Sequence, residues 1–467
     1  MLLLLRQVRE MEVRALLERM GYKGLVSNDW YGRINDWAAW YAGKTKFHSY
    51  TIYNGTQDIP CKRKSLCMAK KVCEDKADLL LNEKVTITVA GGSGNAAQDY
   101  LDAVLEAQNF WVRGNQLVEL ANAAGTGAFV EYKDNDTVCI DFVSASCVWP
   151  LSWYNGDITE CAFVSTFTLG MGGTRIYINR HVLENGKYVV YNDMFDESGK
   201  PVELPDGVIP KWETGSVTPL FQIITPNIAN NIDLTNPMGI SVYANVIDVL
   251  QTIDLVYDSY HNEIKLGKKR IFVDDTVVKP NPKDGSMLPI FDPNDTVFYG
   301  IPGKDNEKSI TESNMNLRVE AHQLALQSSL DILSELCGFG KGYYKFDADE
   351  VQTATAVVSQ NSKLFRKIKK DEIILDKALT DMVRALLFLG GFTGEYDISI
   401  NFDDSIIEDT DAIARRAMLE LGAGIIDNVL CFERVYGMTE EAAAALVQKI
   451  AGRSLPDDEP PYIPEGD

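Results

Sequence analysis

The sequence predicts an α+β protein, and three observations support this fold class. Residues 1 to about 125 carry apolar side chains mainly at helical spacing. Residues 127–230 carry short runs rich in β-branched and aromatic residues, and helical spacing returns after residue 236. Helices and strands thus fall in separate blocks. With 467 residues, the chain exceeds what one hydrophobic core usually holds, so we expect two to four packed regions.

The N-terminal block is expected to be mostly helical. Five aromatic residues recur at nearly helical spacing and predict a packed face, with a ligand cage as the alternative: Trp30, Tyr31, Trp37, Trp40 and Tyr41. Lys62–Asn82 has the pattern of another amphipathic helix, and Val85–Val89 that of a short strand. Gly91–Gly94 follows without the Gly-Lys-Ser/Thr ending of a phosphate-binding loop, so a flexible connection is predicted there.

The next block predicts an antiparallel meander. Its β-rich runs are Ala128–Tyr132, Val138–Phe142, Ala162–Leu169, Arg175–Asn179 and Lys187–Tyr191. The last two flank Asn185-Gly186, the dipeptide preferred in two-residue hairpin turns because both residues tolerate positive φ.

Two helices joined by a compact insert are predicted next. The first begins at Asn236-Pro237, where Asn suits the cap and Pro the first turn, and it ends at Gly267. Residues 270 to about 312 carry strand patterns and proline-rich turns. The second helix is expected over Met315–Cys337, and Gly338 closes it.

A glycine- and aromatic-rich loop then leads into a very long helix, Glu350–Leu389, which would span about 60 Å at ~1.5 Å per residue. A short strand, Tyr396–Phe402, follows. Three shorter helices are expected at Thr410–Leu421, Ile425–Tyr436 and Thr439–Ala451. The acidic, proline-rich tail, residues 455–467, is expected to be disordered.

Composition excludes several classes of function. The net charge of −22 disfavours a conventional nucleic-acid binder but leaves open a conduit whose acidic wall does not hold DNA back. Eight cysteines without a C-x-x-C pair predict reduced thiols and no metal site. Five apolar residues at the start are too few for a signal peptide, and no membrane span is expected. No cofactor or catalytic motif is evident.

Three stretches resemble the portal proteins of tailed bacteriophages, especially long-tailed phages of Gram-positive bacteria. The first joins NPMGISVYAN at 236–245, IDLVYDSY at 253–260 and KKRIFV at 268–273. The second joins CGFG at 337–340 and YYKF at 343–346, and the third TAT at 353–355 and VSQNS at 358–362. The resemblance covers essentially the whole chain. Ala356 stands where the family often has Glu, which removes one acidic side chain from the long helix.

The resemblance implies a portal fold assembled as a ring, with wing, stem, clip and helical crown. The implied parts are a wing (1–235), stem helix 1 (236–267), a clip (268–312), stem helix 2 (313–337), a tunnel loop (338–349), a long wing-spanning helix and strand (350–402), crown helices (403–454) and the acidic tail (455–467).

The resemblance also implies a structural role without enzymatic activity. The ring, usually of twelve copies, would form the channel for genome packaging and ejection at the unique capsid vertex. Its implied partners are the terminase, a head-completion adaptor, the scaffold, the major capsid protein and double-stranded DNA bound without sequence specificity. The implied location is the virion, with assembly in the host cytoplasm.

The implied DNA-contacting residues lie in the tunnel loop: Gly340, Lys341, Gly342, Tyr343 and Lys345. Lysines on a glycine-rich loop suit weak, sequence-blind phosphate contact, but two ordinary solvated lysines would give the same pattern. A second basic cluster either pairs with carboxylates or contacts DNA: Lys363, Arg366, Lys367, Lys369 and Lys370.

An acidic group near residue 403 has two interpretations. Its members are Asp403, Asp404, Glu408, Asp409 and Asp411. Solvated charges at a helix start are favoured by the helix dipole, and a divalent-cation site is the alternative. The sequence leaves two other functions open: a packaging enzyme such as an ATPase or nuclease, and a capsid or tail-adaptor component without a channel.

Overall fold

The computed structural model confirms the mixture of helix and sheet. The residues it describes are 10–53, 55–91, 95–168, 173–267, 270–274, 278–280, 287–289, 298–301, 310–313, 316–345, 354–392, 394–402, 410–436, 438 and 440–451. The chain forms two compact units, Met1–Val351 with Arg366–Phe402, and Gln352–Phe365 with Asp403–Asp467. Within the described ranges, no helix is both long and apolar enough to cross a bilayer.

Five helices open the first unit: α1 (Glu10–Arg19), α2 (Asn28–Tyr41), α3 (Met68–Leu80), α4 (Ala96–Ala107) and α5 (Phe110–Ala124). The aromatic face predicted on α2 packs in the hydrophobic core. Trp30, Tyr31, Trp37 and Trp40 are buried, and the Tyr31 ring stacks on Trp149 with centroids 4.0 Å apart. Tyr41 is only partly buried, and its hydroxyl donates to Glu119 at 2.6 Å.

The helix expected over Lys62–Asn82 begins later than predicted. A hairpin of β1 (Ser49–Tyr53) and β2 (Asp58–Lys62), preceded by the short helix η1 (Lys46–His48), takes its first residue, and α3 starts only at Met68. The backbone amides of Lys64 and Leu66 donate to carboxylates of a distant helix instead of joining a helical ladder. Tertiary contacts therefore override the local apolar pattern.

The predicted antiparallel meander is confirmed for the strands between residues 148 and 213, whereas the runs at 128–132 and 138–142 lie in a separate sheet. Its five-stranded sheet has the order β10-β9-β8-β7-β6, with β6 Val148–Tyr154, β7 Asp157–Thr168, β8 Thr174–Glu184, β9 Lys187–Asp196 and β10 Lys211–Glu213. A second sheet has the order β11-β4-β5, with β4 Gly127–Asp134, β5 Thr137–Ser144 and β11 Phe221–Ile224. The short helix η2 (Ala145–Cys147) connects β5 to β6. Asn185 and Gly186 both have positive φ, 51° and 77°, as the hairpin turn requires.

The helix expected from Asn236 begins eleven residues later: α6 spans Ile247–Leu266. Residues 236–246 form turns because their donors are bonded elsewhere. Asn236 bonds the amide of Met238 through its own side chain, the Gly239 amide donates to Thr126, and that of Val242 donates to the Asn122 carbonyl. Gly239 also lies so close to Gly125 that a Cβ on either would clash with the other's backbone.

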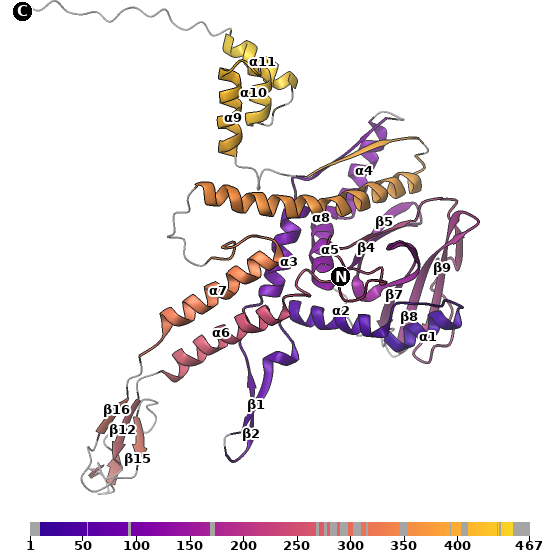
Figure 1. Ribbon diagram of the computed structural model, residues 1–467. Helices are drawn as coiled ribbons and strands as arrows, with labels where there is room; N and C mark the ends of the chain where they lie inside the picture. The colour runs from indigo at the N-terminus through magenta and orange to yellow at the C-terminus, as the bar shows by residue number, and fades with distance from the viewer. Residues whose placement is uncertain are drawn as a thin grey trace, which may run out of the picture. The chain divides into compact units, whose positions relative to one another are not determined.

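The insert between the two helices is a small β module: β12 (Arg270–Asp274), β13 (Val278–Pro280), β14 (Met287–Pro289), β15 (Phe298–Ile301) and β16 (Ile310–Ser313). α7 (Val319–Cys337) returns beside α6 (Figure 1). Glu263 of α6 joins them by accepting from Arg318 at 3.0 Å and contacting His322 at 2.6 Å. The Arg318 contacts, followed by the His322 bond, lower the pKa of Glu263 to about 2.

The long helix α8 spans Ala354–Leu389, about 54 Å at ~1.5 Å per residue. β17 (Asp397–Asn401) follows and pairs with β3 (Thr86–Ala90). The second unit contains α9 (Thr410–Gly422), α10 (Asn428–Tyr436) and α11 (Glu440–Ala451) around a small core of Ala417, Ile426 and Cys431. Residues 403–409 of the acidic group and the tail, 455–467, lie outside the described residues.

Candidate functional site

The loop that follows α7 is built on glycines. Gly338 ends the helix in the left-handed region, and Gly340 and Gly342 repeat positive φ values of 88° and 83°. Ser334 of α7 holds the loop at two points: its carbonyl accepts from the Phe339 amide at 2.9 Å, and its hydroxyl accepts from the Tyr344 amide at 3.4 Å. The chain can therefore turn back on the helix without leaving these donors unpaired.

Three aromatic rings anchor this loop in the core. Phe339 is fully buried and stacks on Tyr343 with centroids 4.6 Å apart, and Tyr344 meets both rings edge-on. Gln327 of α7 donates to the Tyr344 carbonyl at 3.0 Å. Burial, followed by the negative charge of Asp75, raises the pKa of Tyr344, and burial raises that of Tyr343 to about 12. The loop is more firmly held than its glycine content suggests.

Both predicted lysines of the loop are exposed. Gly340 and Gly342 are buried, while the side chains of Lys341 and Lys345 face solvent. The Lys345 stem lies across Gly342, where a Cβ would come within 2.8 Å of Lys345 Cε. The loop therefore presents two cations to solvent, while its aromatic side chains hold its backbone in place. Tyr343, between the two lysines in the sequence, is half-buried.

The second basic cluster does not behave as one patch. Lys363, Arg366 and Lys370 are exposed on α8, but Lys369 pairs with Glu372 at 3.0 Å. Lys367 is half-buried, with its stem packed over Gly338 at the end of α7. Burial, and then the neighbouring Lys76 charge, lowers the pKa of Lys367. Lys367 thus helps to join α7 to α8.

A buried ion pair links α3 to α8. Lys76 Nζ lies 2.8 Å from Asp371 Oδ2, and both side chains are almost fully enclosed. The other Asp371 oxygen accepts from the Asn227 amide at 3.1 Å. A buried pair of this kind stabilises a fold only when both partners are present, since either one alone leaves an uncompensated charge.

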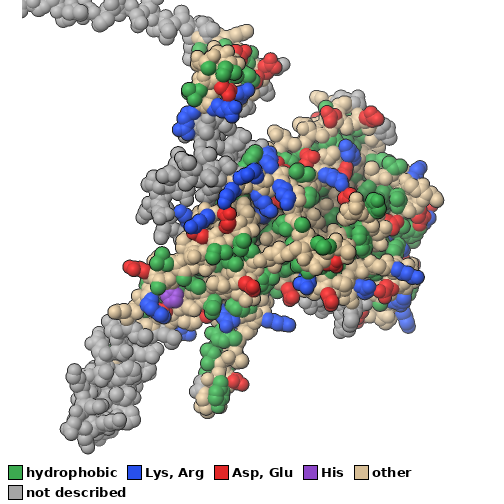
Figure 2. Space-filling view, in the orientation of Figure 1, with side chains coloured by type: hydrophobic (Ala, Val, Ile, Leu, Met, Phe, Trp, Pro, Cys, Tyr) green, Lys and Arg blue, Asp and Glu red, His purple; other side chains and the backbone are tan. Residues whose placement is uncertain are grey.

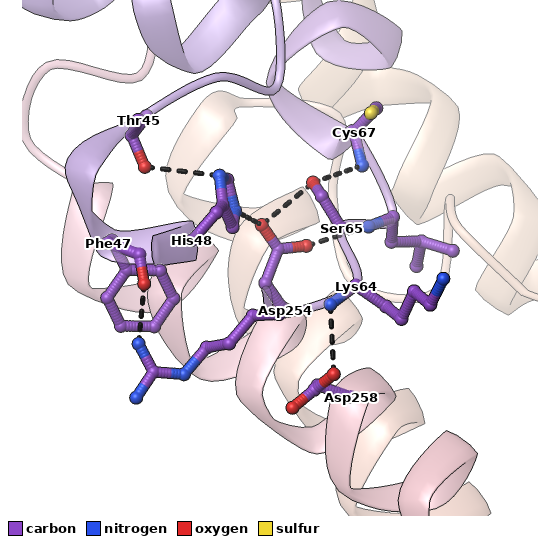
Figure 3. Close-up of polar contacts among 10 residues, drawn as sticks. Thr45, Phe47, His48, Lys64, Ser65, Cys67, Asp254 and Asp258 are labelled. Carbon is purple, nitrogen blue, oxygen red and sulfur yellow. Dashed lines mark hydrogen bonds and ion pairs between the residues drawn. The ribbon is translucent and has the colours of Figure 1, made fainter. Parts of the chain in front are cut away.

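A second polar centre fixes the β1–β2 hairpin to α6 (Figure 3). Asp254 of α6 is buried and accepts from the Ser65 hydroxyl at 2.9 Å and from the Leu66 amide at 2.8 Å. His48 Nε2 lies 2.7 Å from the same carboxylate, and His48 Nδ1 lies 3.2 Å from Thr45. One turn along α6, Asp258 accepts from the Lys64 amide at 2.9 Å.

This centre contains a serine, a histidine and an aspartate, but not in a catalytic order. A nucleophilic serine must be bonded to the histidine, which the aspartate orients from its far side. Here Ser65 and His48 both bond Asp254, so Ser65 is not bonded to the histidine, whose other ring nitrogen contacts the Thr45 hydroxyl instead. The centre is a structural joint, which we call the Asp254 clamp. Among the described residues, no group of three or more potential metal ligands comes together.

Arg63 completes the base of the hairpin. Its guanidinium lies 4.5 Å from the ring centre of Phe47 and 4.4 Å from that of Tyr50, and it donates to the Phe47 carbonyl. Such stacking suits the planar guanidinium and adds to the attachment. No local pattern in the sequence indicates the clamp, because Ser65 and His48 lie 189 and 206 positions from Asp254.

These polar networks join segments of the chain that lie far apart in the sequence. The family follows from comparison: the model described as "Phage portal protein, SPP1 Gp6-like" matches residues 27–453, so the chain belongs to the phage portal protein family. That family is structural and is not known for enzymatic activity.

Curated protein sequences give no match. A solved structure described as "Neck of empty GTA particle computed with C6 symmetry" has a TM-score of 0.45 and 10% sequence identity to this chain. The similarity covers 91% of this chain and 98% of the other.

Proposed function

We propose that twelve copies of this protein form the portal ring at the unique vertex of a phage capsid, around the channel through which DNA is packaged and ejected. The observation that carries this proposal is the family match over residues 27–453. In this role the protein acts without catalysis of its own. It docks the terminase and later a head-completion adaptor, and it meets the scaffold and major capsid protein during assembly.

The succession of elements supports an assignment of the parts. α6 and α7 correspond to the stem, and the β module between them to the clip, which would meet the terminase and adaptor. The loop after α7 corresponds to the tunnel loop, the elements before residue 236 to the wing, and α9–α11 to the crown. Lys341 and Lys345 are then the cations that meet DNA in the channel.

The exposed face of α7 supports assembly. Leu324, Ile332 and Leu336 are 73%, 49% and 58% exposed, and Ala325 and Ser328 on the same helix are exposed too. Helices of soluble proteins usually turn charged side chains outward, and a row of exposed apolar residues marks a surface that another protein covers. In a ring, the neighbouring copy covers it.

Negative-stain electron microscopy of the purified protein tests the proposal. We expect rings with a central hole from the native chain, and loss of rings from the double variant Leu324→Glu, Ile332→Glu. A matched control, Leu183→Glu with Ile209→Glu, changes two exposed residues outside α7 and should keep the rings. Native protein that forms no ring would overturn the portal proposal, and rings in the α7 variant would overturn the role of this face.

A further inference from the structure

The exposed face of α8 is basic although the chain as a whole is acidic. Between residues 366 and 388 the exposed positions of this helix are Arg366, Lys370, Ile373, Asp376, Lys377, Arg384 and Phe388. Four of these seven are cations and one is an anion, whereas the whole chain has 45 basic and 67 acidic residues. Figure 2 shows Lys and Arg side chains gathered over the surface where Figure 1 draws α8.

The four cations form a straight row. They are separated by four, seven and seven residues, which at about 100° per residue places them within an arc of about 40°. From Arg366 to Arg384 the row is about 27 Å long at ~1.5 Å per residue. All four belong to the same compact unit, so the row depends on one helix alone.

The acidic groups beside the row are exposed and bind it weakly. Lys377 lies 3.5 Å from Asp157, and Arg384 lies 2.8 Å from Asp381. The two cations are 69% and 55% exposed, and solvent screens such pairs strongly. An incoming anion of higher charge density can therefore displace these carboxylates.

We propose that this row, Arg366, Lys370, Lys377 and Arg384, binds the phosphate backbone of double-stranded DNA. Charge repeated along a line is the property of a nucleic-acid backbone, and cations without a shaped pocket bind it without sequence preference. A protein partner would be expected to bury a group of apolar side chains at the centre of its interface. Between the cations of this row, Ile373 is the single exposed apolar residue of α8. The inference rests on the proposed portal function, since a portal meets packaged DNA, and it adds a site outside the tunnel loop.

The test measures binding of a labelled 30-base-pair duplex of random sequence to the full-length assembled protein between 20 and 200 mM salt. The stripe variant replaces all four residues of the row by Gln. The control variant replaces four exposed lysines on other elements, Lys62, Lys133, Lys187 and Lys211, by Gln in the same way. Both variants therefore lose the same charge. We expect the stripe variant to bind at least roughly tenfold more weakly, with a salt slope reduced by about 3 to 4, while the control binds like the native protein.

Ring formation is scored by microscopy on the same samples, which separates this inference from the proposed function. Rings that bind the duplex equally well with and without the row would overturn the inference and leave the portal proposal intact. The same holds if native rings fail to bind at 20 mM salt, or if the control loses as much affinity as the stripe variant. Loss of rings in the stripe variant alone would show that the row contacts a neighbouring copy, which would also overturn it.

Discussion

Glu131 offers a test of the energetics of the β region. It lies on β4 and is fully buried, and neither carboxylate oxygen has a hydrogen-bond partner among the described residues. Burial raises its pKa to about 8, against an ordinary value of 4.5, although the nearby Gln222 amide acts in the opposite direction. The carboxyl is therefore mostly protonated in the folded protein at neutral pH.

The direction of the pH effect follows from proton binding. The unfolded chain releases this proton near pH 4.5, whereas the folded chain holds it until about pH 8. Between these values the folded state binds more protons than the unfolded state, so raising the pH lowers the free energy of unfolding. This loss of stability is complete above about pH 8. At about 1.4 kcal/mol per pKa unit, the difference between 4.5 and about 8 amounts to about 5 kcal/mol.

Glu131→Gln removes this dependence, because an amide does not ionise. The free energy of unfolding of the variant, relative to that of the native protein, should rise by about 1.4 kcal/mol for each pH unit between about pH 5 and pH 8. The measurement is urea unfolding followed by circular dichroism across that range, with the exposed Glu83→Gln as control. If the native protein and Glu131→Gln have parallel stability profiles, the buried, protonated carboxyl is refuted.

Two further predictions concern the clamp and the tunnel loop. Asp254→Ala should destabilise the first unit by about 3–5 kcal/mol, because His48 and Ser65 lose their buried acceptor, and hydrogen exchange should accelerate in residues 48–66 more than in the β meander. Uniform acceleration would show that the clamp does not specifically hold the hairpin. Lys341→Glu with Lys345→Glu should leave folding and rings intact but give phage heads empty of DNA, since each copy would place two negative charges at the channel. DNA-filled heads would identify these lysines as ordinary solvated charges.

Segments governed by local interactions could be predicted from the sequence. The Asn185-Gly186 turn depends only on the positive φ of its own two residues. The end of α7 at Gly338 and the length of α8 follow from glycine placement and apolar spacing. In the candidate site, the exposure of Lys341 and Lys345 also agrees with a glycine-rich loop.

The row on α8 was only partly visible in the sequence. Arg366 and Lys370 stand close to other basic residues in the sequence, whereas Lys377 and Arg384 are isolated. Their seven-residue spacing was the available signal, but it becomes informative only when the exposed side of the helix is known.

Propensity, spacing and turn chemistry act over a few residues, so the α+β class and the order of the elements could be predicted without the structure. The resemblance to portal proteins likewise rests on short stretches of sequence. The tertiary structure alone decided where α6 begins, since Asn122 and Thr126 engage the amides of Val242 and Gly239 and keep that segment out of a helix. It also decided that the loop after α7 is anchored by its aromatic rings and that Asp254 holds the hairpin. The start of α6 and the attachment of the hairpin depend on partners more than a hundred residues away along the chain. The anchoring of the loop depends on which of its sides is buried. Neither can be predicted from a local pattern of residues.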